Sequence, residues 1–89
     1  MKCVTIDFRQ VENVEDFYAQ FARKFAIERE FGANLDALWD ALTGMIALPA
    51  RLTLRHLDDH EDAAQFADAI LVMREAETAL DGLFQLHVD

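Results

Sequence analysis

The sequence predicts a two-layer α/β fold, in which a three-stranded parallel sheet carries all of its helices on one face. Three short segments, at residues 2–8, 50–56 and 83–88, alternate between apolar and polar side chains, as half-buried strands do. Helical patterns separate them, and crossovers of this kind join parallel strands. A parallel sheet covered on both faces would read as continuous apolar runs, so the alternation indicates that one face stays uncovered.

The first strand is expected to turn Val4, Ile6 and Phe8 inward, and a helix is expected to follow it. Asn13 can cap that helix, because its side chain can accept a hydrogen bond from the first turn. Glu15 and Asp16 near the start, with Arg23 and Lys24 near the end, suit the helix dipole. The apolar stripe of this helix consists of Val14, Phe17, Tyr18, Phe21, Ala22 and Phe25.

A second helix is predicted to begin after Asn34 and to end near Gly44, which suits the position just past a helix end. The next strand turns Leu52 and Leu54 inward. A longer helix follows at about 61–80, after a short helical turn at 56–60, and Gly82 ends it. Its inward face carries Phe66, Ala69, Ile70, Met73 and Leu80.

The last strand is expected to bury Phe84, Leu86 and Val88. The side chains that alternate with the buried ones should lie on the uncovered face of the sheet. These are Thr5, Arg51, Thr53, Arg55, Gln85 and His87.

Length and composition predict one packed domain over residues 1–89. Apolar residues make up 53% of the chain, and no apolar run is long enough to cross a membrane. The N-terminus lacks the pattern of a secretory signal. Cys3 is the only cysteine, which excludes an internal disulfide and favours a cytoplasmic location; we expect its side chain to be partly buried.

Seventeen acidic residues against eight basic ones give a net charge of −9. This charge disfavours nucleic acid and anionic membranes as partners, because like charges repel. It favours a basic protein partner, whose approach it would accelerate. Acidity that serves only solubility is the alternative interpretation.

The segment 31–46, FGANLDALWDALTGMI, combines a buried edge with an acidic one. On a helix, Asp36 and Asp40 stack four residues apart, and Trp39 lies between them and an apolar stripe. That stripe consists of Leu35, Leu38 and Leu42. The two carboxylates are interpreted either as a solvated polar face or as phosphate mimics for a basic pocket, since arginine binds carboxylate and phosphate with the same geometry.

Catalysis is not predicted. A catalytic carboxylate pair needs a cleft and two different environments, which one exposed helix face does not offer. No phosphate-binding loop, dinucleotide fingerprint or CxxC pair is present, so no cofactor is expected. His56 and His60 have a spacing that could hold a metal on one helical turn, but a solvated turn is the preferred interpretation, and we predict no metal site.

The run from Gly32 through Asn34-Leu35-Asp36-Ala37-Leu38-Trp39-Asp40 to Leu42-Thr43-Gly44 closely resembles the core motif of the barstar family, intracellular inhibitors of ribonucleases. The order of elements, Pro49 before the second strand and the triplet Arg74-Glu75-Ala76 fall in register with that family over essentially the whole chain.

The resemblance implies a barstar-like fold and a protein that plugs a ribonuclease active site. The family pattern places Asp40 in the nuclease's phosphate pocket and Asp36 at the rim of its site. Thr43 and Gly44 match the edge of the contact, Trp39 lies beside the contact helix, and Glu75 adds a peripheral ion pair. The free chain is expected to be a monomer.

Two positions depart from the family pattern. Glu30 and Met45 stand where barstar has aromatic residues, which predicts a target other than barnase and more basic than it. Met45 and Ile46 are expected either to supply an adaptable apolar contact or to pack as ordinary loop residues. The changed positions also leave open an immunity or regulatory protein of the same fold that binds a basic toxin other than a ribonuclease.

Overall fold

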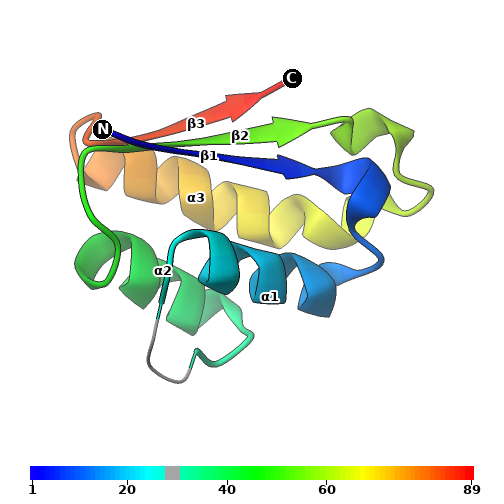
Figure 1. The fold of residues 1–89 in the computed structure, drawn as a ribbon, viewed down its shortest axis with the longest axis horizontal. Helices are drawn as coiled ribbons and strands as arrows, with labels where there is room; N and C mark the ends of the chain where they lie inside the picture. Colours follow the sequence, from blue (N-terminus) through cyan, green and yellow to red (C-terminus); the bar gives the residue numbers. More distant parts are fainter. Residues whose placement is uncertain (28–30) are drawn as a thin grey trace.

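The computed structural model describes residues 1–27 and 31–89, and it confirms the predicted fold class (Figure 1). Three parallel strands form one sheet in the order β1-β2-β3, and three helices lie together on one side of it. The strands are β1 (Lys2–Asp7), β2 (Ala50–Arg55) and β3 (Phe84–Val88), and the helices are α1 (Val14–Lys24), α2 (Leu35–Gly44) and α3 (Ala67–Ala79). Short 3₁₀ helices occupy η1 (Phe8–Gln10), η2 (Leu57–Asp59) and η3 (Ala63–Phe66).

The predicted cap at Asn13 is confirmed, and the helix predicted to begin after Asn34 is capped by Asn34 in the same way. The Asn13 side chain accepts a hydrogen bond from the backbone N–H of Asp16 at 2.9 Å, and the Asn34 side chain accepts one from Ala37 at 2.8 Å. Asparagine is favoured at these positions because it satisfies an N–H that has no partner within the helix.

The helix ends differ from the prediction. Gly44 is the last residue of α2 itself, and Met45 follows as its cap. After α1 and α3, Ala26 (φ 54°) and Asp81 (φ 55°) adopt the left-handed conformation that glycine usually supplies. Gly82 follows one residue later, and its N–H donates to Glu77 O at 3.2 Å, which satisfies a carbonyl at the end of α3.

The core lies between the sheet and the helices and is rich in aromatic rings. Phe8 and Phe66 meet edge to face with their centroids 4.8 Å apart. The largest fully buried side chains are Phe8, Phe17, Phe21, Phe66, Phe84, Ile6, Leu38, Leu42, Leu52, Leu54 and Met73.

Two expectations about the core and one about the start of a helix were wrong. Leu35 is 37% exposed, because it is the first residue of α2 and borders an open groove. Val88 is 38% exposed at the end of β3, beyond the cover of the helices. The long helix begins at Ala67 instead of residue 61, because η3 packs against the start of α1, where the Gln65 side chain accepts a hydrogen bond from Val14 N–H at 2.9 Å.

Side chains from the helices cover backbone groups on both edges of the sheet. On β1, Lys24 Nζ donates to Thr5 O at 2.7 Å. On β3, Leu86 N–H donates to Glu77 Oε2 at 2.9 Å, and Arg74 Nη1 donates to Leu86 O at 2.9 Å. In the described part of the chain, no further strand pairs with β1 or β3 at these edges, and these side chains supply the hydrogen bonds instead. The backbone groups of Thr5 and Leu86 named here are therefore satisfied within the protein and do not need water or another chain.

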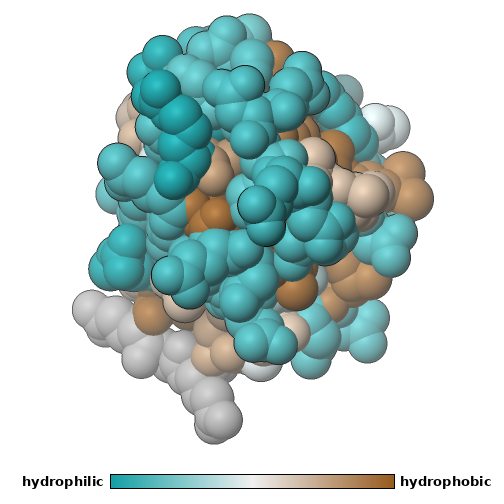
Figure 2. Space-filling model, turned by 90° about the vertical axis from the view of Figure 1, so that its right-hand side faces the viewer, coloured by the Kyte–Doolittle hydropathy of each residue, from teal (hydrophilic) through white to brown (hydrophobic). Residues whose placement is uncertain are grey.

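The face of the sheet away from the helices carries the polar side chains that the alternation predicts. Arg51 Nη2, for example, donates across strands to Gln85 Oε1 at 3.1 Å. Cys3 is exposed, which contradicts the expectation of partial burial, because its side chain points to this uncovered face. Figure 2 shows that the end of the molecule nearest the 3₁₀ helices is mainly hydrophilic, with apolar residues in small separate areas. Within residues 1–27 and 31–89, no helix has the length and apolar character needed to cross a membrane.

Candidate partner-binding face

Helix α2 has one buried side and one exposed side. Leu38, Ala41 and Leu42 are completely buried, and they hold α2 against the core and the neighbouring α3. Asp36 and Asp40 are exposed on the other side, as their spacing predicts. A helix fixed by its buried side presents these carboxylates on a rigid support, so little ordering is required when a partner binds them.

Neither carboxylate has a partner in the described part of the chain. No hydrogen bond or ion pair joins Asp36 or Asp40 to another residue in the part of the chain that the structure describes. Residues four apart on a helix lie about 5–6 Å from each other, and two like charges at this spacing cost about 0.2–0.5 kcal/mol. Asp36 is favoured by its place in the first turn of α2, whereas Asp40 has no such compensation.

Trp39 and Thr43 flank the two carboxylates. Trp39 is half-buried and packs against the core, and its carbonyl oxygen accepts a hydrogen bond from Thr43 Oγ1 at 2.8 Å. Thr43 is exposed, so its hydroxyl oxygen keeps acceptor capacity toward solvent. A Cβ added at Gly44 would meet nothing within 4 Å, and the internal packing therefore does not require glycine there.

The remaining predicted contact residues do not all lie on the exposed side of α2. Met45 is half-buried at the end of α2, and Ile46 is only 8% exposed, so Ile46 belongs to the core and offers little surface. Glu75 is exposed on α3, the helix that packs beside α2. Glu30 lies outside the described residues.

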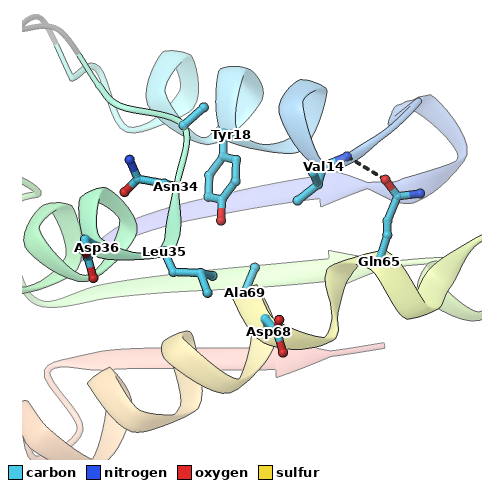
Figure 3. A pocket seen from close by; sticks show the side chains of 9 residues that line it. Val14, Tyr18, Asn34, Leu35, Asp36, Gln65, Asp68 and Ala69 are labelled. Atoms are coloured by element: carbon cyan, nitrogen blue, oxygen red, sulfur yellow. Dashed lines mark hydrogen bonds between the residues drawn. The ribbon is translucent and has the colours of Figure 1, made fainter.

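A groove that the sequence did not reveal opens beside Asp36 (Figure 3). It has a volume of about 510 Å³ and lies between the first turns of the three helices; its lining includes Tyr18, Leu35, Asp36, Asp68 and Ala69. Burial, and secondarily the negative charge of Asp68, raise the pKa of Tyr18. Helical periodicity assigned Tyr18 to the core, and it gives no sign that the hydroxyl reaches a groove.

His56 and His60, whose spacing could hold a metal on one helical turn, have other contacts in the structure. His60 Nε2 lies 2.8 Å from Val11 O, and His56 Nδ1 lies 3.2 Å from Asp7 Oδ1. Hydrogen bonds from the backbone and side chain of Arg9 lower the pKa of Asp7 to about 2. No group of three or more metal-binding side chains occurs among residues 1–27 and 31–89.

The fold and this face define a small acidic α/β protein that displays two exposed carboxylates on the solvent side of α2. The sequence profile of the Barstar family, described as barstar (barnase inhibitor), matches residues 1–88. The chain is also similar to "Putative ribonuclease inhibitor YrdF" of Bacillus subtilis (strain 168), with 34% identity over 91 residues that cover the whole of both proteins. The chain therefore belongs to the Barstar family.

Proposed function

We propose that this protein inhibits a basic ribonuclease by covering its active site with the outer face of α2. The observation that carries the proposal is the pair of exposed carboxylates of Asp36 and Asp40, which have no partner among residues 1–27 and 31–89, on a helix whose other side is buried. The family description and the name of the relative, both of which refer to ribonuclease inhibition, support it.

The mechanism is substitution for the substrate's phosphates. A ribonuclease holds the RNA backbone with arginine and lysine side chains, and these groups bind a carboxylate with the same charge-assisted hydrogen bonds. Asp40, near the middle of the face, enters the phosphate pocket, and Asp36 binds at its rim. RNA is then excluded by occupancy, and this chain carries out no chemical step.

Two further features fit a basic target. The net charge of −9 attracts a cationic protein over distances near the Debye length, which raises the association rate at low salt. Glu75 on the neighbouring α3 supplies a peripheral charge, which contributes less than a carboxylate that loses its water on binding.

The target is expected to differ from barnase. Met45 borders the face as a half-buried, flexible side chain, where the family pattern has an aromatic residue. The stacking contact that such an aromatic would make is absent, so recognition depends more on charge than it does in barstar.

A titration of inhibition tests the proposal. Purified protein is mixed with barnase and a panel of other small basic ribonucleases, and cleavage of a fluorogenic RNA is followed. We expect stoichiometric inhibition of at least one enzyme, and Asp40→Asn should raise its inhibition constant by about 30-fold or more, because breaking a desolvated charge pair costs about 2 kcal/mol or more. Asp58→Asn, which removes the same charge from an exposed residue of η2, is the matched control. Lack of inhibition throughout the panel, or equal inhibition by the Asp40 and Asp58 variants, would contradict the proposal.

A further inference from the structure

The ring of Tyr18 is buried beside α2, and its hydroxyl opens into the groove without a hydrogen-bond partner among the described residues. Tyr18 is only 4% exposed, and its ring points from α1 into the space between the first turns of α2 and α3 (Figure 3). No hydrogen bond within the described part of the chain engages its oxygen, although several groups nearby are paired, including Gln65 with Val14 N–H. Because this hydroxyl faces the groove, it can both donate a hydrogen bond to a ligand there and accept one from it.

The walls of the groove combine apolar surface with negative charge. Leu35 and Ala69 contribute apolar surface from α2 and α3, and Leu35 is unusually exposed for a leucine beside the core. Asp36 and Asp68 contribute one carboxylate from each of these helices, and Asp68, like Asp36, has no ion-pair or hydrogen-bond partner among the residues described.

A long cationic side chain matches this lining. Its methylene stem can lie along Leu35 and Ala69, while its charged end approaches the carboxylates and the phenol oxygen. Arginine fits better than lysine, because its guanidinium carries five N–H donors in a plane and can serve several acceptors at once. An anionic or neutral ligand would leave both carboxylates uncompensated.

We propose that this groove is a second recognition subsite, which binds an arginine side chain of the same basic partner that docks on α2. This inference rests on the proposed function, since Asp36 borders both the groove and the outer face of α2. Simultaneous occupancy would make the inhibitor select partners that present an arginine at the matching distance from their active site.

A titration with a minimal ligand tests the subsite without any nuclease. N-acetyl-arginine amide is added to the ¹⁵N-labelled full chain at low salt, and amide shifts are followed by NMR. We expect saturable shifts at residues 33–36 and 65–69, whereas N-acetyl-citrulline amide, which has nearly the same shape but no charge, should produce none. Asp68→Asn and Tyr18→Phe should each weaken binding by about 3-fold or more. Asp58→Asn should leave the affinity unchanged.

Stability measurements on the same variants separate binding from folding. Tyr18→Phe should leave the midpoint of thermal unfolding unchanged or slightly raised, because the hydroxyl it removes has no hydrogen-bond partner in the part of the chain that the structure describes. The subsite is wrong if arginine amide causes no saturable shift, if citrulline amide causes the same shifts, or if the shifts are insensitive to both Asp68→Asn and Tyr18→Phe.

The nuclease assay completes the test. Against an enzyme that the parent protein inhibits, Asp68→Asn should raise the inhibition constant by about 3-fold or more, and Asp58→Asn should not. Equal constants would overturn the subsite and leave inhibition through α2 intact. If the parent protein inhibits no nuclease but arginine amide causes saturable shifts, the proposed function is wrong. The proposal that the groove binds an arginine of a nuclease is then wrong as well.

Discussion

Replacement of Glu77 by alanine should destabilise the protein, because this partly buried carboxylate on α3 satisfies a backbone group at the edge of β3. Glu77 accepts the N–H of Leu86 at 2.9 Å and lies 3.3 Å from Arg74 Nη1, which itself donates to Leu86 O. Leu86 is 5% exposed, so its N–H has little access to water when Glu77 is truncated.

The expected magnitude follows from these contacts. An N–H left without a partner in a shielded position costs about 1–3 kcal/mol, and loss of a partly exposed ion pair adds about 0.3 kcal/mol. The sum is about 2 kcal/mol of unfolding free energy. For a chain of this length, 1 kcal/mol moves the thermal midpoint by about 4–8 °C, so a decrease of about 8–16 °C is expected.

Urea and thermal unfolding followed by circular dichroism measure this effect. Glu77→Gln keeps an acceptor and should lose less than half as much stability. Glu75→Ala, two residues earlier on the same helix and without a partner among the described residues, should change the unfolding free energy by no more than about 0.5 kcal/mol. If Glu77→Ala and Glu75→Ala unfold at the same temperature, the role assigned to Glu77 at the sheet edge is refuted.

Three further predictions concern other parts of the chain. Ala26→Gly should raise the free energy of unfolding in urea by about 0.5–1 kcal/mol, because Ala26 has φ 54°, a conformation that favours glycine. Ala19→Gly, in the exposed interior of α1, should lower it by about 1 kcal/mol. A lower stability of the Ala26→Gly variant would contradict the reasoning. The pKa of Asp7 is lowered to about 2 in the folded state, so its contribution to stability is present above the unfolded value near 4 and disappears as the pH falls toward 2. Asp7→Asn should therefore flatten the dependence of unfolding free energy on pH between 4 and 2, and an unchanged slope would exclude this role. Asp40→Ala should raise the unfolding free energy of the free protein in urea by about 0.5 kcal/mol, because it removes repulsion from Asp36 and because alanine favours the helix. The same change should weaken inhibition. A lower unfolding free energy would mean that Asp40 has an internal partner.

Local patterns were sufficient to predict most of the fold. The strands follow from alternation. The helix α1 follows from an asparagine cap ahead of a regular apolar stripe, and α2 follows from the apolar stripe that begins after Asn34. The start of α3 could not be predicted in the same way. Its apolar spacing continues into η3, and the packing of η3 against α1, which includes the contact between Gln65 and Val14, joins residues far apart in sequence.

The candidate site was predictable to a different extent. Spacing alone placed Asp36 and Asp40 on the outer face of α2, because periodicity determines which side of a helix a residue occupies. Periodicity also placed Tyr18 in the core, where its ring does lie, but it cannot indicate that the hydroxyl of a buried ring reaches a groove. That groove is formed by three helix starts, and their relative positions depend on tertiary packing.

Trp39 makes this protein its own optical probe. It is the only tryptophan in the chain, and it lies within α2, next to Asp40 and bonded through its carbonyl to Thr43. Because its ring is half-buried against the core, its emission responds both to unfolding and to any surface that covers this side of the helix. A 5-fluorotryptophan label would give a single ¹⁹F resonance from this chain, visible even when the bound protein contains tryptophans of its own. Docking could therefore be timed in a mixture without attaching a dye to either molecule.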